Sequence, residues 1–301
     1  ACQDPESPAF SRAGAMLALR RFLSDASFDE ARRNLDSNQS VLRVAAVSKL
    51  EDLPPEQSHA SLVRMLHDPI VSVRTEAARI LSRSPQTLFE ESDYKLFRVV
   101  FQELKKRFEY NLDRPESHLS LGILAENQND PILAEEHYRS AINRESTDVP
   151  ARMNLATLLS RRGRNREAEK LLREAIRYQP TWGQVYYSLG LLLAEDRSRL
   201  PEATRTLEKA AGYALDNPRI FHNLAIAYWQ QEKVDPAVTA FLRAIELEPN
   251  NPQFVQNLLQ LLAQKQRWKE ALPYARRMVE LTPSNPQAIN FLREIERKIS
   301  P

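Results

Sequence analysis

Histidine and cysteine, which bind many metals and carry out much acid–base and nucleophilic chemistry, are few in this chain. The five histidines stand on different segments, and none has a second ligand at the spacing that a metal site requires. They are His59, His67, His118, His137 and His222. The sequence also lacks a glycine-rich phosphate loop, a nucleophile elbow, a HExxH helix and a cysteine paired with a histidine. We therefore expect no metal, no cofactor and no catalytic centre.

A basic cluster is the next candidate for chemistry, because it could bind a phosphate or an acidic peptide. Its members are Arg161, Arg162, Arg164, Arg166, Lys170 and Arg173. Three carboxylates, Glu167, Glu169 and Glu174, are interleaved with these cations. We therefore favour a solvated, ion-paired helix face over an anion site.

Composition and charge favour a helical protein. There are 6 glycines in 301 residues, while alanine, leucine, arginine and glutamate are abundant, which is typical of helices. The formal net charge is +2, and residues 1–114 carry 17 basic and 17 acidic groups. Nucleic acid and anionic membranes require concentrated positive charge, so we expect neither of them as the main partner.

The chain offers no membrane-spanning segment and little information about its compartment. Its best apolar run, residues 189–194, is far shorter than the roughly 18 residues of a membrane span. The single cysteine, Cys2, excludes an internal disulfide without identifying a compartment. Because the sequence starts at Ala1, we expect that an initiator methionine and any targeting segment have been removed or lie outside it.

A stride of 34 residues organises the C-terminal two thirds of the chain. One leucine marks it, at Leu121, Leu155, Leu189, Leu224, Leu258 and Leu292, with a single interval of 35 residues. A small residue usually follows this leucine, and alanines recur in step further along each unit. Such repetition predicts a stacked α-solenoid, in which each unit buries its apolar face against its neighbours.

Each unit contains two predicted amphipathic helices. In the second unit they cover residues 151–162 and 166–178. Small side chains are needed where two helix axes cross closely, and we expect this role for Ala156, Ala168 and Ala175. Two Asp-Pro pairs, Asp130-Pro131 and Asp235-Pro236, predict an N-cap followed by a proline at the first helical position.

These units resemble the tetratricopeptide repeat. The shared pattern is Leu-Gly or Leu-Ala, a large residue three positions on, then alanine, an aromatic residue or leucine, alanine and proline. Five units match over residues 115–285, and a capping helix is expected over residues 286–301. Departures are local, since Ser146 and Leu215 replace the terminal proline and Met278 replaces an alanine.

A weaker period of 31 residues precedes residue 90. Three residue types recur in three units, at Arg12, Arg43, Arg74, Ala15, Ala46, Ala77, Leu19, Leu50 and Leu81. Asp36 and Asp68 precede two of the arginine helices, where a carboxylate could cap a helix and pair with an arginine of the same or a neighbouring unit. This pattern resembles HEAT repeats, so we expect HEAT-like helices over residues 1–90.

A longer helix is expected to join the two arrays over residues 91–114. Its apolar positions, at three- and four-residue spacings, are Tyr94, Phe97, Phe101, Leu104 and Phe108. Such a stripe predicts a buried face. The fold class is therefore all-α, a HEAT-like block followed by five tetratricopeptide units and a capping helix.

The order of the two blocks resembles something narrower, the C-terminal tail of certain bacterial multihaem c-type cytochromes. The segments that carry this resemblance are 53–57, 68–79 and 113–122. The haem attachment signal Cys-x-x-Cys-His is absent from the sequence, so no haem is implied in this chain. The resemblance implies a periplasmic location with electron-transfer proteins nearby, and a cytoplasmic adaptor is the alternative.

The tetratricopeptide resemblance also implies a binding surface, because the first helices of such repeats form a concave wall. The candidate groove residues are Leu119, Met153, Asn154, Tyr187, His222, Asn223, Trp229, Gln256, Asn257 and Gln260. Amides can bond the backbone of an extended peptide at its donors and acceptors, and aromatic residues can contact its side chains. Lysine is missing from these positions, so a ligand held by its terminal carboxylate is not expected.

We therefore predict a non-enzymatic scaffold that binds a peptide segment of a partner protein. A groove that holds only water is the simpler alternative. A second alternative is a structural or homo-oligomerising part of a longer polypeptide, because the first HEAT-like helix begins near Pro8 with nothing ahead to cover it. Nucleic-acid binding through residues 161–173 is the least favoured possibility.

Overall fold

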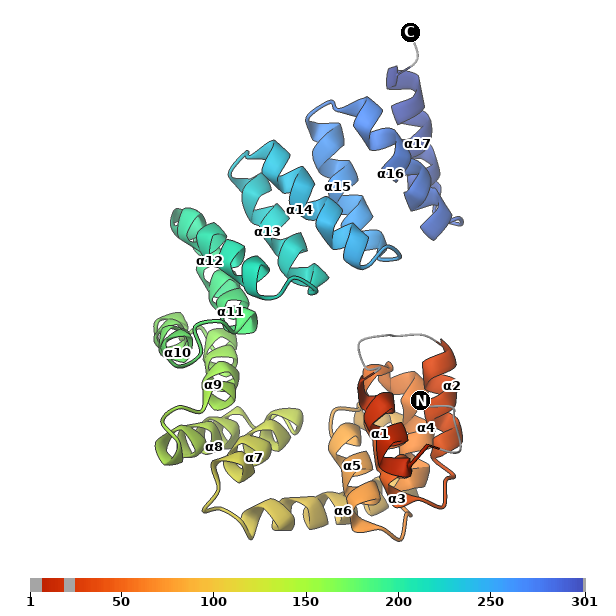
Figure 1. Ribbon diagram of the computed structural model, residues 1–301, viewed down its shortest axis with the longest axis vertical. Coiled ribbons are helices and arrows are strands. Elements are labelled where there is room, and N and C mark those ends of the chain that lie inside the picture. Colours follow the sequence, from red (N-terminus) through yellow and green to blue (C-terminus); the bar gives the residue numbers. More distant parts are fainter. Residues whose placement is uncertain (1–6, 19–24, 300–301) are drawn as a thin grey trace. The chain divides into compact units, whose positions relative to one another are not determined.

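The computed structural model describes residues 7–18 and 25–299, and within these ranges every regular element is helical (Figure 1). There are seventeen α-helices, α1 to α17, and three short 3-10 turns in this part of the chain. The all-α, solenoid prediction is confirmed. The chain divides into two compact units, Ala1–Ser146 and Thr147–Pro301, and each is treated separately below.

The first unit contains eight α-helices. They are α1 (Ala9–Ala18), α2 (Asp25–Asn34), α3 (Ser40–Lys49), α4 (Pro55–Met65), α5 (Val71–Leu81), α6 (Glu91–Glu109), α7 (Pro115–Asn127) and α8 (Pro131–Arg144). Residues from the 31-residue period form much of its core, since Ala46, Leu50, Ala77 and Leu81 are buried. Leu19 lies outside the described residues.

Ion pairs join successive parts of the first unit. Asp68 precedes α5 and accepts hydrogen bonds from Arg43 of α3 at 2.7 and 3.0 Å and from the backbone N–H of Ile70 at 2.8 Å. Burial acts to raise the pKa of Asp68, but these hydrogen bonds and the Arg43 charge outweigh it and lower the pKa. Asp68 therefore pairs with Arg43, the periodic arginine of the preceding 31-residue repeat. Asp36 pairs with Arg64, which is not one of the periodic arginines.

Helix α6 shows the buried stripe that its sequence predicts. Phe97, Phe101 and Leu104 are buried, and Tyr94 and Phe108 pack against the same core. Helix α6 ends at Glu109, and a short turn leads to Pro115 at the start of α7.

The second unit contains nine α-helices in this part of the structure. They are α9 (Val149–Arg161), α10 (Asn165–Tyr178), α11 (Gly183–Ala194), α12 (Leu200–Tyr213), α13 (Pro218–Gln230), α14 (Val234–Leu247), α15 (Pro252–Gln264), α16 (Trp268–Leu281) and α17 (Pro286–Ile299). Each helix packs on the next along the chain, so the helices form a stack of antiparallel pairs (Figure 1). The odd-numbered members α9, α11, α13 and α15 are the first helices of their repeats.

Small residues permit close packing within the pairs. Ala156, Ala168 and Ala175 are fully buried, as expected. Gly190 on α11 shows the constraint most directly, because an added Cβ would lie 2.7 Å from the buried side chain of Leu207 on α12. In the first unit, a Cβ at Gly122 would lie 2.5 Å from the ring of Tyr138. A side chain larger than hydrogen would push these helix pairs apart.

The turns between paired helices share a left-handed residue. It falls at the same position in four of the 34-residue repeats: Asn129 (φ 57°), Gly163 (φ 74°), Glu232 (φ 59°) and Gln266 (φ 56°). The next backbone N–H bonds back to the carbonyl five residues earlier, as from Arg164 to Leu159 at 2.9 Å and from Lys233 to Tyr228 at 3.0 Å. These bonds are typical of a Schellman helix end. The remaining repeat, which contains α11 and α12 and has the 35-residue interval, has a 3-10 turn at Arg197–Arg199 instead.

One Asp-Pro prediction is confirmed and the other is wrong. Asp130 caps α8, since its carboxylate accepts from the backbone N–H of Leu133 at 3.0 Å. Helix α14 begins at Val234, so Asp235 lies inside the first turn. Its carboxylate pairs with Arg267 instead. In the repeat register Lys233 is the counterpart of Asp130, and Lys233 is the N-cap residue of α14. The register of the repeats, and not the local Asp-Pro pair, therefore sets where this helix begins.

Candidate functional site

The predicted groove residues of α11 and α13 contact each other directly. Asn223 donates a hydrogen bond from Nδ2 to the hydroxyl oxygen of Tyr187 at 2.8 Å, and a second to the carbonyl of Arg219 at 2.9 Å. Both side chains are half-buried. Burial raises the pKa of the Tyr187 hydroxyl, against smaller opposing effects from Asn223 and Arg219. Tyr187 therefore stays protonated at neutral pH.

A second pair joins α13 to α15. Asn257 Nδ2 lies 2.8 Å from His222 Nε2, and Asn257 Oδ1 accepts from Gln253 at 2.9 Å. With the amide in this orientation, His222 Nε2 is the acceptor and Nδ1 carries the proton. Burial lowers the pKa of His222, which favours this neutral form. The imidazole lies against the ring of Phe254, with centroids 4.7 Å apart.

A third contact joins the far ends of α13 and α15. The indole nitrogen of Trp229 donates to Gln264 Oε1 at 2.9 Å. Gln264 is absent from the predicted site, although its place four residues after Gln260 on one helix face could have indicated it.

We call these six residues, Tyr187, Asn223, His222, Asn257, Trp229 and Gln264, the amide ladder. It links α11, α13 and α15. Because Asn223 donates one Nδ2 hydrogen to Tyr187 and the other to the carbonyl of Arg219, it has no side-chain donor left for a ligand. The amide ladder thus fixes neighbouring repeats side by side, a role that repeat position alone does not predict.

The remaining predicted residues fall in three places. Met153 and Asn154 lie half-buried on α9 of the second unit. Leu119 lies half-buried on α7 of the first unit. Gln256 and Gln260 are exposed on α15, where they line a pocket.

This pocket, which we call the C-terminal pocket, has a volume of about 560 Å³ and lies between α15 and α17. Its lining consists of Gln256, Leu259, Gln260, Ala263, Gln264, Met278, Asn285, Gln287, Ala288 and Phe291. Leu259, Met278 and Ala288 are buried and form an apolar base. Five amides and no charged group surround this base. The pocket therefore suits an uncharged ligand that needs both donors and acceptors.

The structure also contains a histidine pair that the sequence analysis missed. His118 of α7 and His137 of α8, in the first unit, lie with their Nδ1 atoms 3.2 Å apart. Burial lowers the pKa of both rings. Among the described residues no group of three or more His, Cys, Asp or Glu side chains could hold a metal ion. His118 and His137 are 19 residues apart in the sequence, so no short motif indicates that their side chains meet.

Arg164 and Arg173 of the basic cluster form ion pairs, as expected. Arg164 pairs with Glu167 at 2.7 Å, and Arg173 pairs with both Glu169 at 2.7 Å and Glu202 at 2.6 Å. Hydrogen bonds from Arg199, then Arg173, lower the pKa of Glu169 to about 2, although burial opposes them.

Comparisons with known proteins agree with the repeat assignment. Two family models, both described as tetratricopeptide repeat, match residues 127–192 and 222–286. The chain therefore contains tetratricopeptide repeats. The HEAT-like interpretation of residues 1–90 and the resemblance to cytochrome tails lie outside these matches and stay predictions.

Solved structures share the fold. PilF of Pseudomonas aeruginosa matches with a TM-score of 0.54 and 19% identity, over 73% of this chain and 97% of that one. YrrB, described as a TPR protein with an unusual peptide-binding site, matches with a TM-score of 0.50 and 18% identity, over 62% of this chain and 95% of that one.

Curated relatives match only in part. Human protein O-mannosyl-transferase TMTC3 is 30% identical over 149 residues, which are 44% of this chain and 16% of that protein. The general transcriptional corepressor ssn6 of Schizosaccharomyces pombe is 27% identical over 139 residues, 45% of this chain and 12% of that protein. The chain thus spans less than a fifth of either relative. No helix in the described ranges is both long and apolar enough to cross a membrane.

Proposed function

We propose that this protein is a non-enzymatic scaffold that binds an extended, uncharged peptide segment of a partner protein in the C-terminal pocket. The observation that carries the proposal is the composition of this pocket, five amides around an apolar base with no charged group. Tetratricopeptide repeats are typically scaffolds for protein interaction, and the peptide-binding site described for YrrB supports the same class of ligand.

The chemistry of the lining favours a particular ligand. An extended backbone presents alternating N–H and C=O groups, and glutamine side chains can bond to both. The apolar base can bury one aliphatic or aromatic side chain of the peptide. A terminal carboxylate would lose its hydration without gaining a cationic partner there, so the ligand is an internal segment.

The predicted groove residues then have two different roles. Gln256 and Gln260 contact the ligand, because both are exposed and line the pocket. The amide ladder positions α15 against α13, because its polar groups bond one another. Gln264 belongs to both the ladder and the pocket lining. Substitutions of the other ladder residues alter binding indirectly, so substitutions of Gln256, Gln260 and Gln287 are the cleaner test.

The test is affinity capture from the native host's extract with the wild-type chain and a Gln256→Ala, Gln260→Ala, Gln287→Ala variant. Exposed glutamines outside the pocket provide a matched control, Gln179→Ala with Gln230→Ala. All three proteins should show the same helical circular dichroism. We expect a protein that the wild type and the control retain and the pocket variant loses. Capture of the same proteins by all three, or of none by the wild type, contradicts the proposal.

Self-association is a second candidate function, favoured by one observation. Phe10 on α1 is 80% exposed, and an apolar side chain in water is a common feature of an interface. Met16, on the same helix, is buried at 3% exposure and belongs to the core. If α1 mediates association, sedimentation velocity will show a concentration-dependent dimer that Phe10→Ser abolishes. A monomer at all concentrations rules this function out.

We also propose that the helices before α6 are HEAT-like repeats and that the protein is periplasmic. The Arg43–Asp68 pair between successive units supports HEAT-like packing before α6. The resemblance to cytochrome tails supports a periplasmic location, with a cytoplasmic adaptor as the alternative, and cell fractionation distinguishes them. Nucleic-acid binding through residues 161–173 is the least favoured function, because Arg164 and Arg173 already have carboxylate partners.

A further inference from the structure

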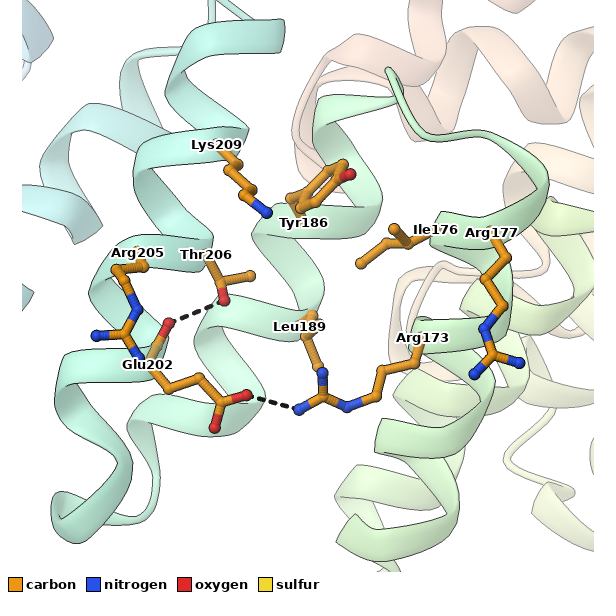
Figure 2. Close-up of a pocket in the computed structure, with 9 residues that line it drawn as sticks. All are labelled: Arg173, Ile176, Arg177, Tyr186, Leu189, Glu202, Arg205, Thr206 and Lys209. Carbon is orange, nitrogen blue, oxygen red and sulfur yellow. Dashed lines mark hydrogen bonds and ion pairs between the residues drawn. The ribbon is translucent and has the colours of Figure 1, made fainter.

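A second pocket of about 510 Å³ lies between α10 and α12, with α11 beneath it (Figure 2). It is lined by Arg173, Ile176, Arg177, Tyr186, Leu189, Glu202, Arg205, Thr206 and Lys209. We call it the α10–α12 pocket. It shares no residue with the C-terminal pocket or the amide ladder, so it is independent of the proposed function.

The base of the α10–α12 pocket is apolar and fixed. Leu189 is buried beneath α12, and Ile176 is half-buried on α10. Tyr186 is also buried, and its hydroxyl donates to the carbonyl of Pro180 at 2.9 Å. This hydrogen bond holds the ring in place at one side of the base. The pocket can therefore take an apolar group without rearranging its own side chains.

The rim of the pocket is strongly cationic. Four of its side chains carry positive charge and one carries negative charge. The one carboxylate, Glu202, already bonds to Arg173 at 2.6 Å and to Arg199 at 2.7 Å. Within the described part of the chain, Arg177, Arg205 and Lys209 form no ion pair. Lys209 Nζ instead lies 5.9 Å from the ring centroid of Tyr186.

The excess of positive over negative side chains distinguishes the α10–α12 pocket from an ordinary solvated helix face. On such a face the charges alternate and neutralise one another, as Glu169 and Arg199 do nearby at 2.6 Å. Three cations without carboxylate partners line the pocket at its edges, with Arg177 on the α10 side of the apolar base and Arg205 and Lys209 on the α12 side (Figure 2). A low-dielectric base strengthens the attraction of these cations for an anion that enters.

The cationic surface continues beyond the pocket along α10. A smaller hollow of about 310 Å³ shares Arg173 and Arg177 with it and adds Arg166 and Lys170. The carboxylates in this hollow are engaged, Glu169 with Arg173 and Arg199, and Glu174 with Arg152 at 3.5 Å. A ligand with several negative charges could therefore extend from the pocket along α10.

We infer that the α10–α12 pocket binds an acidic peptide segment of a second partner. An apolar side chain of the peptide lies between Ile176 and Leu189, and flanking carboxylates pair with Arg177, Arg205 and Lys209. Arginine forms bidentate bonds with carboxylates, and the apolar base selects a ligand with a buried side chain. Double-stranded nucleic acid satisfies the cations but leaves the apolar base unfilled, because its bases are paired and stacked inside the duplex.

Fluorescence anisotropy with short labelled peptides tests this inference. The main probe carries aspartate and glutamate around one central phenylalanine. A second probe has serine in place of phenylalanine, and a third has lysines in place of the acidic residues. A single-stranded oligonucleotide of similar charge provides the other class of polyanion. We expect the main probe to bind at least about tenfold more tightly than any of the others at physiological salt.

Charge-reversal variants locate the site. Arg177→Glu with Arg205→Glu should weaken binding of the main probe at least about tenfold. Lys269→Glu with Arg293→Glu, on exposed positions of α16 and α17, makes the same change in net charge and should leave binding within about twofold. The Gln256→Ala, Gln260→Ala, Gln287→Ala variant should bind the probe as the wild type does, which separates this site from the C-terminal pocket.

Three results would overturn the inference. The first is no binding of the main probe by the wild type. The second is equal weakening by both pairs of charge reversals, which would mean nonspecific attraction. The third is tighter binding of the oligonucleotide, which would mean a nucleic-acid site, or of the serine probe, which would mean a polyanion site without a role for the apolar base. Equal thermal unfolding of both reversal variants confirms that each is folded.

Discussion

At the scale of single residues, the contacts between first helices and within helix pairs leave little room for change. Tyr187 and Asn223 join α11 to α13, and His222 and Asn257 join α13 to α15. Within one pair, Gly190 lies against Leu207 with no space for a methyl group. The position of each ligand-facing side chain depends on these contacts, because they set the distance between neighbouring helices.

Gly190→Ala tests the close approach of α11 and α12. The added Cβ would lie 2.7 Å from Leu207 Cγ, and such overpacking costs about 1–3 kcal/mol, more than the roughly 0.5–1 kcal/mol that alanine gains in helix propensity. We expect a lower urea midpoint. Gly212→Ala on α12 is the control, because no atom lies within 4 Å of its added Cβ. It should raise the midpoint, and a rise for both variants would contradict the packing argument.

At the scale of elements, the turns and the ion pairs between helices hold the repeats in register. The left-handed turn residue falls at the same position in four repeats, and only one of the four residues is glycine. Between second helices, Glu169 and Glu202 alternate with Arg173 and Arg199 to form a closed set of ion pairs across α10 and α12. Each feature makes a separate contribution to stability.

Glu232→Gly tests the turn between α13 and α14. Glu232 is exposed and has φ 59°, a conformation that costs a residue with a Cβ about 1 kcal/mol relative to glycine. The substitution should therefore stabilise the protein by about 1 kcal/mol in urea unfolding. The reverse change, Gly163→Glu at the equivalent turn, should destabilise it by a similar amount. Destabilisation by Glu232→Gly would show that the carboxylate has an interaction that outweighs the strain.

The pH dependence of stability tests the ion pairs across α10 and α12. The pKa of Glu169 falls from 4.5 to about 2 on folding. Its contribution is therefore complete above pH 4.5 and is lost as the pH falls towards 2. Because Arg173 is 45% exposed, solvent screening limits this contribution to about 1 kcal/mol.

The measurement is urea unfolding of the wild type and Glu169→Gln between pH 7 and pH 2. The difference between the two proteins should be constant down to about pH 5 and then shrink towards pH 2. Glu246→Gln, which breaks an exposed pair with Arg243, should change stability by less than about 0.5 kcal/mol at any pH. A Glu169→Gln difference that stays constant to pH 2 would contradict the assignment.

At the scale of the whole molecule, the elements could be predicted from the sequence because each repeat is a local structure. The leucine stride and the small residues place α9 and α10 within two residues of their predicted bounds. The histidine pair on α7 and α8 and the α10–α12 pocket could not be predicted. Both depend on which side chains meet across helices, and Arg177 and Arg205 give no signal by spacing alone.

The candidate site shows the same limit. Tyr187 bonds to Asn223 and His222 bonds to Asn257, because neighbouring repeat positions of stacked first helices lie side by side. Repeat position alone could not show that these groups bond one another. Asp235 is the opposite case, in which a local N-cap signal is overridden by the register of the stack.

The most direct test of the central claim is the affinity of the C-terminal pocket for the segment of a captured partner. Isothermal titration calorimetry would compare the wild type with the Gln256→Ala, Gln260→Ala, Gln287→Ala variant. Loss of three hydrogen-bonding amides should weaken binding by about tenfold to a hundredfold, at about 0.5–1 kcal/mol each. The Gln179→Ala, Gln230→Ala control should bind as the wild type does. Unchanged affinity of the pocket variant would contradict the claim that this pocket binds the peptide.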